Sequence, residues 1–408
     1  MNLLPLYIDP GTGSALFSIV IGIAAVSYFL FRTVFLKIRV LLFRQKETSY
    51  SQQKFVVYAE DKRYWPFFEP ILVECEARQI SVLYLTSSPD DPVFSSSFRY
   101  VNGKFIGKGN KAFAYLNFLS ADFVLATTPD LDVLQWKRSK AIKHYCHMFH
   151  MVSGSMIYRL FGLDFYDSVL LSGENEIPEI RYLENLRKLP GKQLVVVGNT
   201  FLDRYNEKLK SLPAEENHQF TVLVSPSWGA SGLLKVYGER LLDPLIGTGW
   251  RIILRPHPQS VIAEKSLLDR LTERYRDSSN IEWDYHHENI YSLAKSDVMV
   301  SDFSGIIYDY IFLFDKPVLL SLSTMDLRPY DAYNLPEEPS YFQISKKVGL
   351  ELDEANFSSI KNVITDSLHN AELRENRQEA KRIMWQHHGE ASRRIVDFMV
   401  ETVNKGNV

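Results

Sequence analysis

The stretch DVMVSDFSGIIYDYIFLFDKPVLLSL, residues 297–322, shows how this chain is built. It opens with a short apolar run that ends at Asp302, and it closes with a second apolar run that starts at Pro317. Between the two runs, residues 304–315 have the length and composition of a helix. A strand, a helix and a strand in this order predict a βαβ unit, in which the two strands are parallel.

The same alternation extends to both sides of this stretch and predicts an α/β protein. A polar segment at 199–219 interrupts it and is the best candidate for a linker. We therefore expect doubly wound parallel sheets in an N-terminal domain at 50–200 and a C-terminal domain at 218–370, followed by a long terminal helix within 371–408. The expected strands lie at 55–59, 81–86, 122–128, 141–149, 167–173, 193–198, 220–226, 250–258, 280–285, 297–302 and 317–322, and the expected helices at 66–79, 111–120, 177–189, 233–249, 262–277 and 304–315.

Length and composition agree with two such domains and exclude some classes of protein. The chain has 408 residues, of which 46% are hydrophobic and 23% charged, an ordinary globular composition that argues against disorder. Its 46 Lys and Arg against 49 Asp and Glu give a net charge of −3, which argues against a nucleic-acid partner. The two cysteines, Cys75 and Cys146, exclude a disulfide-stapled fold and fit a reducing compartment.

The N-terminal segment, residues 1–46, has the pattern of a membrane anchor with a basic flank. Residues 14–31 carry no charge and are mostly apolar, at the short end of what spans a bilayer. Five cations and no acid occur from Arg32 to Lys46, whereas Asp9 is the only charged side chain before the span. This bias predicts a single-pass protein of the cytoplasmic membrane with its bulk in the cytoplasm. A cleaved signal peptide is the alternative, but its cations would precede the apolar stretch.

Polar residues at strand ends carry the functional argument, because ligands of doubly wound proteins bind where strand ends meet helix starts. Ser301 and Asp302 end one strand, and a helix begins near Ser304 and Gly305. Free N–H groups and the positive end of that helix would face an anion such as a phosphate, although Ser304 could equally be a plain helix cap. Asp309 could accept hydrogen bonds from ribose or substrate hydroxyls, or be a solvated helix residue.

Two further loops follow predicted strands. In the segment ILRPHPQS, Arg255 and His257 lie in a loop that two prolines hold extended. Arginine suits a phosphate, and histidine can donate to one or exchange a proton, whereas the alternative is a surface loop with a solvated histidine. In the segment VLVSPSWGASGLL, Ser225 and Ser227 belong to a Ser- and Gly-rich loop that could bind phosphate through its amides, although this signal alone is weak.

Three histidines, His144, His147 and His150, recur every third residue in KHYCHMFHMVSG. On a helix this spacing would suggest a metal site, but the flanking residues indicate a strand, where His147 faces the other way. No nearby residues complete a ligand set, so no metal is expected. His150 precedes the following loop and is our candidate for a general base, whereas the alternative makes all three packing or surface residues.

The ordered pair RPHP and SDFSGIIYDY…DKPVL resembles the CDP-glycerol glycerophosphotransferase family of teichoic-acid-type polymer synthesis. The resemblance covers roughly residues 120–400. It implies a GT-B-like architecture, with two Rossmann-like domains facing a cleft, and an enzyme that needs no cofactor. It also implies transfer of glycerol phosphate from CDP-glycerol to a hydroxyl of a membrane-linked or cell-surface glycan or polymer, with release of CMP. The implied partners are a nucleotide-activated donor, a glycan or lipid-linked acceptor, and the membrane.

The resemblance also implies roles for single residues. The family's second histidine corresponds to His257, its Ser-Asp-x-Ser to Ser301, Asp302 and Ser304, and its acidic residue to Asp309. Gly305 replaces the second serine that is usual in the family. The family's first histidine, usually in a His-Gly pair, is assigned to base catalysis, and FHMVSG offers His150 without the glycine. Two alternatives stay open: a GT-B glycosyltransferase that uses a CMP- or UDP-sugar, and a non-catalytic, membrane-anchored nucleotide-binding protein.

Overall fold

The structure is a computed structural model that describes residues 26–28, 31, 52–212, 218–286, 288–321 and 325–406. The chain divides into two units, Met1–Ser51 and Gln52–Val408, and the second unit contains every strand that the structure describes. The predicted anchor at 1–46 lies outside the described residues except for a few positions. Among the helices that the structure does describe, none combines the length and the apolar character that a membrane crossing requires.

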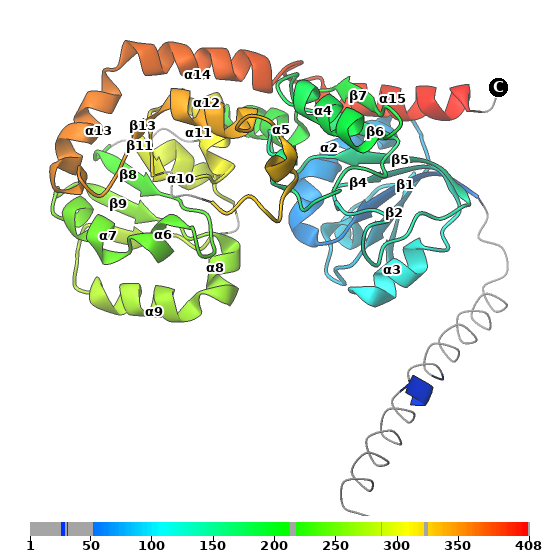
Figure 1. The fold of residues 1–408 in the computed structure, drawn as a ribbon, viewed down its shortest axis with the longest axis horizontal. Helices are drawn as coiled ribbons and strands as arrows, with labels where there is room; N and C mark the ends of the chain where they lie inside the picture. Colours follow the sequence, from blue (N-terminus) through cyan, green and yellow to red (C-terminus); the bar gives the residue numbers. More distant parts are fainter. Residues whose placement is uncertain are drawn as a thin grey trace, which may run out of the picture. The chain divides into compact units, whose positions relative to one another are not determined.

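The first half of the second unit, which we call the N-half, is built on a seven-stranded sheet (Figure 1). Its strand order is β3-β2-β1-β4-β5-β6-β7, and every neighbouring pair is parallel. The strands are β1 (Gln53–Ala59), β2 (Val82–Thr86), β3 (Val101–Phe105), β4 (Ala121–Ala126), β5 (Ile142–Met148), β6 (Ser168–Leu171) and β7 (Gln193–Val196). The helices are η1 (Lys62–Tyr64), α2 (Trp65–Ala77), η2 (Pro92–Ser95), α3 (Asn110–Leu116), η3 (Ser155–Ile157), α4 (Ile177–Arg187) and α5 (Thr200–Leu209).

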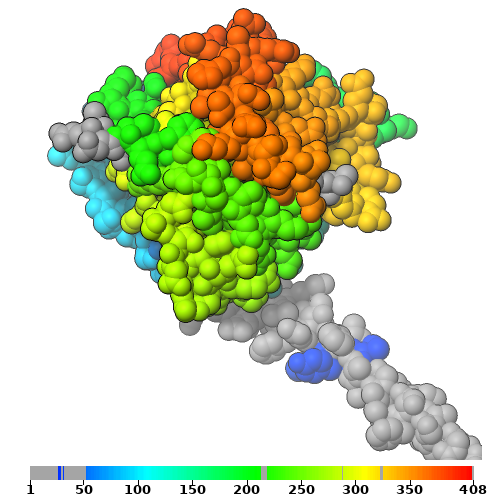
Figure 2. Space-filling view, turned by 90° about the vertical axis from the view of Figure 1, so that its left-hand side faces the viewer, coloured from blue at the N-terminus to red at the C-terminus, as the bar shows by residue number. Residues whose placement is uncertain are grey.

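The second half, which we call the C-half, repeats this design with a six-stranded parallel sheet in the order β10-β9-β8-β11-β12-β13. The strands are β8 (Thr221–Val224), β9 (Arg251–Leu254), β10 (Ile281–Trp283), β11 (Val298–Ser301), β12 (Val318–Leu320) and β13 (Gly349–Glu351). The helices are α6 (Leu233–Val236), α7 (Glu239–Ile246), α8 (Pro258–Ala263), α9 (Lys265–Arg274), α10 (Ile290–Lys295), α11 (Ile306–Phe314), η4 (Asp331–Asn334), α12 (Ser340–Val348), η5 (Phe357–Ser359), α13 (Ile360–Leu368), α14 (Ala371–Met384) and α15 (Ala391–Lys405). Figure 2 shows the outer face of this half, with α9 in yellow-green and α13 and α14 in orange.

Each sheet is buried on both faces, which explains why its strands read as continuous apolar runs. In the N-half one core cluster includes residues of α3 and α4, and the other includes residues of α2 and α15. In the C-half the corresponding clusters include residues of α7, α9 and α13 on one face, and of α11, α12 and α14 on the other. The strand order reverses between β1 and β4 in the first sheet, and between β8 and β11 in the second. Ligands of such sheets bind at these reversal points, beyond the carboxyl ends of the strands.

Segments of each half pack into the core of the other. Val152, in the loop after β5, belongs to a core cluster that includes residues of α11 and α12. In the opposite direction, Ala332 of η4 belongs to the core of the N-half, and the last helix, α15, returns to pack with α2. Between the halves, the N–H of Ser340 also donates a hydrogen bond to Glu179. These exchanges join the two halves through shared core residues.

Two expectations about the connections are wrong. The predicted linker at 199–219 contains the helix α5, which Asn199 caps by accepting a hydrogen bond from Leu202 N–H at 3.0 Å. The predicted long terminal helix is two helices, α14 and α15, broken between them where His387 and Gly389 adopt the positive φ angles of 54° and 76°. The break lets α14 cover the C-half while α15 covers the N-half.

Candidate functional site

Asp302 organises the reversal point of the second sheet. It lies at the carboxyl end of β11 and is fully buried. Its two carboxylate oxygens accept hydrogen bonds from Ser227 N–H (2.9 and 3.1 Å), Ser227 Oγ (2.9 Å), Leu233 N–H (2.8 Å) and Ser304 N–H (3.1 Å). One side chain thus fixes both the loop after β8 and the start of the segment that leads into α11.

The serines near Asp302 also help to hold the loop after β8 in place. Ser301 is fully buried, and its hydroxyl donates to the backbone oxygen of Ser225 at 2.6 Å, across the adjacent strands β11 and β8. Ser225 is buried and donates its own N–H to Val300 O at 3.0 Å. The hydroxyl groups of Ser301 and Ser227 donate hydrogen bonds to acceptors within the protein. Both residues therefore support the shape of the loop. Their predicted contact with the donor therefore stays a prediction.

The start of α11 presents backbone donors rather than a side-chain cap. The helix is capped by Gly305, and the predicted side-chain cap by Ser304 does not form; instead the Ser304 N–H turns to Asp302. Within the described part of the chain, the N–H groups of Gly305 and Ile306 donate no hydrogen bond. These two donors and the positive end of a nine-residue helix are suited to bind an anion.

Asp309 lies one turn farther along α11 and has no hydrogen-bond or ion-pair partner among the described residues. Burial raises the pKa of its carboxyl group to about 8. Burial, and after it the Asp309 carboxylate, raise the pKa of Tyr205. A half-buried carboxyl group without a partner is costly, and such groups are typical of binding sites.

Replacing Asp309 with asparagine should stabilise the fold in a pH-dependent way. The folded pKa of about 8 lies above the ordinary value of 3.8, so ionisation weakens the folded state progressively as the pH rises from about 4 to about 8. Asparagine cannot ionise. We expect Asp309→Asn to match the parent near pH 4 and to melt about 2–5 °C higher at pH 8.5 in thermal unfolding. The matched control is Asp366→Asn on the exposed part of α13, which should show no such pH-dependent gain; an equal gain in both variants would contradict the assignment.

The loop after β9 supplies the two predicted residues of the RPHP segment, and the structure gives them different environments. His257 is half-buried and caps α8, because its Nδ1 accepts from Gln259 N–H at 3.0 Å. That bond places the ring proton on Nε2, which is thereby a donor. Burial, together with the positive charge of Arg63, lowers the pKa of His257 to about 4, so the ring is neutral at pH 7.

Arg255 is buried rather than presented to a ligand. Its Nη1 donates to Asp284 Oδ2 at 2.6 Å, and its Nη2 donates to the backbone oxygen of His286 at 2.7 Å. Burial would raise the pKa of Asp284, but hydrogen bonds from Ser292, His286 and Arg255 hold it below its ordinary value. The geometry therefore makes Arg255 a support for the loop that carries His257, and its contact with phosphate stays a prediction.

His150 occupies the corresponding position in the N-half, directly after β5. Its ring lies 5.0 Å from the ring of Tyr64 and 6.4 Å from that of Tyr158, between centroids. Its Nδ1 is buried without a hydrogen-bond partner. Burial, together with the charge of Arg63, lowers the pKa of His150 to about 4. The imidazole is thus neutral at pH 7, which is the form of histidine that can accept a proton.

Glu176 fixes the loop that follows His150. It is buried and accepts from Gly154 N–H at 2.8 Å and from the N–H and hydroxyl of Ser155, each at 2.7 Å. Met151 in this loop lies against the start of α11, since a Cβ added to Gly305 would lie 3.9 Å from the Met151 Cβ. The loop carrying His150 and the start of α11 are therefore next to each other.

The other two histidines are structural. His144 stacks on Phe123 with ring centroids 5.1 Å apart and bonds to Ser168 Oγ at 2.8 Å. His147 is fully buried and bonds through Nε2 to the Tyr158 hydroxyl at 3.2 Å. Within the ranges that the structure describes, no group of His, Cys, Asp or Glu residues has the arrangement of a metal site. Cys146 is buried in the core.

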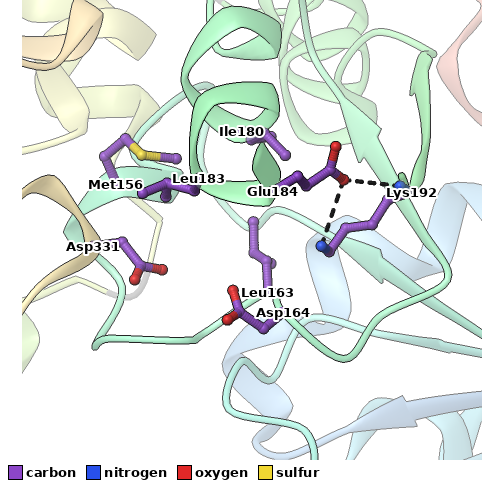
Figure 3. Close-up of a pocket in the computed structure, with 8 residues that line it drawn as sticks. All are labelled: Met156, Leu163, Asp164, Ile180, Leu183, Glu184, Lys192 and Asp331. Carbon is purple, nitrogen blue, oxygen red and sulfur yellow. Dashed lines mark hydrogen bonds and ion pairs between the residues drawn. The ribbon is translucent and has the colours of Figure 1, made fainter. Parts of the chain in front are cut away.

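A small cavity in the N-half lies apart from these residues (Figure 3). Glu184 on α4 accepts hydrogen bonds from the N–H and from the Nζ of Lys192 there, at 2.8 and 3.5 Å. Arg187 bonds to Asp331 of η4 and, at 2.6 Å, to Asp164. These charges are paired with one another, so the geometry indicates a structural network that ties η4 to the N-half.

Two parallel α/β halves, with candidate residues at both reversal points, define a GT-B-like protein, and comparison with solved structures confirms this fold. The wall teichoic acid polymerase TagF matches with a TM-score of 0.55 and 13% identity over 92% of this chain and 98% of that chain. A putative UDP-N-acetylglucosamine 2-epimerase from Listeria monocytogenes matches with a TM-score of 0.56 and 14% identity over 87% and 98%. The UDP-GlcNAc 2-epimerase from Neisseria meningitidis matches with a TM-score of 0.53 and 14% identity over 86% and 100%.

The sequence comparison is more specific than the fold. Residues 203–401 match the family described as CDP-Glycerol:Poly(glycerophosphate) glycerophosphotransferase, and this part of the chain belongs to that family. The matched part contains the RPHP loop, the Asp302 network and α11. The protein is therefore a glycerophosphotransferase-like enzyme, as the sequence predicts. No curated protein sequence matches the chain significantly.

Proposed function

We propose that the protein transfers glycerol phosphate from CDP-glycerol to a hydroxyl group of a membrane-linked or cell-surface glycan or polymer, and releases CMP. The family match of residues 203–401 supports CDP-glycerol as the donor. The fold that this chain shares with a teichoic acid polymerase is consistent with a polymer acceptor. The observation that carries the proposal is the approach of the His150 loop to the anion-binding start of α11. A proton acceptor and a phosphate site are the two things that this reaction needs.

In this mechanism the acceptor hydroxyl attacks the β-phosphorus of CDP-glycerol. A new bond forms between the acceptor oxygen and that phosphorus, the bond from the phosphorus to the bridging oxygen breaks, and CMP leaves with the electron pair. His150 takes the hydroxyl proton on its neutral imidazole ring. Its pKa of about 4 describes the site without ligand, and the negative charge of a bound donor raises the pKa towards the range of an effective base.

The C-half holds the donor. The N–H groups of Gly305 and Ile306 bind the phosphate oxygens at the helix start, and the Nε2–H of His257 donates to the oxygen on which charge develops. Asp309 accepts hydrogen bonds from hydroxyl groups of the donor, which supply the partner that it lacks. Asp302 keeps the loop after β8 in place for these contacts.

Replacing Gly305 with serine should be tolerated and should strengthen donor binding. The residue has an ordinary φ angle of −59°, and an added Cβ would meet its nearest neighbour at 3.9 Å, so there is room for the side chain. Serine supplies a hydroxyl donor at the start of α11, at the position where the related family has one. We expect Gly305→Ser to keep the melting temperature within about 2 °C and to lower the KM for CDP-glycerol about two- to fivefold. Gly305→Ala is the control without the hydroxyl, and an equal KM for both variants would contradict this role.

The location of the enzyme is part of the same proposal. A segment at 14–31 that anchors the chain in the cytoplasmic membrane, with the catalytic halves in the cytoplasm, would bring the site to membrane-linked acceptors. The uncharged stretch and the following cations support this location. Membrane fractionation of the full chain, beside a chain that starts at residue 47, tests it. We expect the full chain to require detergent for release and the shortened chain to be largely released without it.

A donor screen tests the reaction. Detergent-solubilised protein is incubated with CDP-glycerol, CMP-sugars and UDP-sugars in the presence of a membrane acceptor fraction, and nucleotide release is measured. We expect CMP release from CDP-glycerol that depends on the membrane fraction. Nucleotide release from a nucleotide sugar alone would indicate that the acceptor attacks the anomeric carbon, as in a GT-B glycosyltransferase. Nucleotide binding without turnover, in the presence of an acceptor fraction shown to be competent, would indicate a non-catalytic protein.

A further inference from the structure

The donor carries a diphosphate, and the residues predicted to bind it bring no free positive charge. Arg255 is buried and paired with Asp284. His257 is neutral at pH 7 because burial and Arg63 lower its pKa to about 4. Two adjacent negative charges in a half-buried site would be costly without a cation. A further basic residue must therefore face the diphosphate.

Arg63 has the position and the free donors that this role requires. It lies in η1, just after β1, at the carboxyl edge of the first sheet. Asp61 accepts from the Arg63 N–H at 2.9 Å and from its Nε at 3.0 Å, so the guanidinium group is oriented. In the described part of the chain, its two Nη groups donate to no protein acceptor, and half of the side chain, 51%, is exposed. The ring of the next residue, Tyr64, lies beside that of His150, with centroids 5.0 Å apart and the planes tilted by 51°.

The charge of Arg63 acts on both candidate histidines, which come from different halves. It lowers the pKa of His150 and of His257, and in each case it is the second largest cause after burial. Among the described residues, the other titratable groups near these rings are Tyr64, Tyr158 and His147 at His150, and Glu264 at His257. Near Arg63 itself lie Asp61 and Glu60. The guanidinium group is thus a positive charge shared by the two sides of the candidate site.

We infer that Arg63 binds the diphosphate of the donor through its free Nη groups, close to His150 and His257, and offsets the charge that develops on the leaving CMP. This inference rests on the proposed function. The planar guanidinium fork suits a phosphate, and Asp61 pre-orients it, so little side-chain freedom is lost on binding. Arg63 also gives the N-half a part in donor binding. The donor would therefore bind beside His150, the proposed base.

Binding measurements separate this role from a general effect on the fold. Calorimetric titrations with CDP and with cytidine are compared for the parent, Arg63→Gln, Arg63→Lys and Lys62→Gln. Lys62 is the matched control, because it is the neighbouring cation but pairs with Asp90. We expect Arg63→Gln to weaken CDP binding by about 10- to 100-fold and cytidine binding by less than twofold. Arg63→Lys should fall between the parent and Arg63→Gln, and Lys62→Gln should match the parent.

Histidine titration by NMR provides a second readout that a merely structural role would not move. Without the positive charge, the pKa values of His150 and His257 should both rise in Arg63→Gln and stay unchanged in Lys62→Gln. CDP affinity within twofold of the parent, with unchanged histidine pKa values, would overturn the inference. If the parent releases CMP from CDP-glycerol and Arg63→Gln does so equally well, the inference fails while the proposed function stands. If Arg63→Gln loses CDP binding but the parent turns over no CDP-glycerol, the diphosphate site stands and the proposed function fails.

Discussion

Replacing His257 with alanine should lower the rate of glycerophosphate transfer by about 100-fold or more at saturating donor. The reason is the fixed tautomer of the ring. Nδ1 accepts from Gln259 N–H, so Nε2 carries the proton and can donate to the oxygen that gains charge as the bond to CMP breaks. A donor that is oriented before the reaction stabilises the transition state more than the ground state. The measurement is the single-turnover rate of CMP release, with the KM for donor measured separately.

The alanine variant also removes a helix cap, which costs about 1 kcal/mol of stability, so a second variant is needed. His257→Asn keeps an oxygen that can cap α8, and it does not extend as far as Nε2. We expect its melting temperature to stay near that of the parent while its rate falls as far as that of His257→Ala. A rate within threefold of the parent in His257→Asn would remove His257 from the mechanism.

Replacing His150 with alanine should lower the transfer rate by about 10²–10⁴-fold, the range of general base catalysis. The neutral ring is the active form, so the rate of the parent should fall as the pH decreases through the pKa of His150 in the donor complex. Without ligand that pKa is about 4, and the bound anion moves it upward. The variant should lose this acid limb of the pH profile, and its rate should be nearly independent of pH between about 5 and 8.

The matched control is His144→Asn, in the same strand–loop segment. His144 packs on Phe123 and bonds to Ser168, away from the start of α11. We expect this variant to keep the rate and the pH profile of the parent. If His150→Ala kept the acid limb, another group would be the base, and His150 would have no part in the proton transfer.

The strands that can be predicted from the sequence are those that are buried on both faces. The strands β8, β9 and β11 are short apolar runs because helices cover both faces of their sheet, and the sequence predicts all three. The edge strand β3 escapes prediction because Asn102, Gly103 and Lys104 are polar or small, and its residues are largely exposed. The helix α5 escapes it because its exposed face is polar, as in a linker, while Leu202 and Tyr205 are buried against the core.

The site can be predicted in outline, because strand ends in a parallel sheet are its natural location. The candidate residues His150, His257 and Asp302 lie at or just after such positions, and Asp309 lies in the helix that follows β11. The sequence cannot distinguish a side chain that faces a ligand from one that holds a loop, because that depends on partners far along the chain. The partner of Arg255 is Asp284, which follows the next strand of the sheet.

Arg63 escapes prediction for a related reason. It follows the first strand in a charged turn, EDKRY, that has the composition of an exposed loop. Nothing in the sequence shows that Asp61 orients its side chain or that its charge acts on histidines from both halves. The position at the end of the first strand, at the reversal point of the sheet, is the signal that could have drawn attention to it.

Attack on phosphorus moves the β-phosphate to the acceptor, whereas attack on carbon leaves it with the nucleotide, so the fate of this phosphate distinguishes the two reactions. CDP-glycerol labelled with ³²P in the β-phosphate is incubated with the solubilised protein and the membrane acceptor fraction. We predict that the label passes to the acceptor fraction in step with the release of unlabelled CMP, and that His257→Asn slows this transfer by about 100-fold or more. Label that stays with the nucleotide as CDP, while glycerol passes to the acceptor, would show attack at carbon and contradict the mechanism.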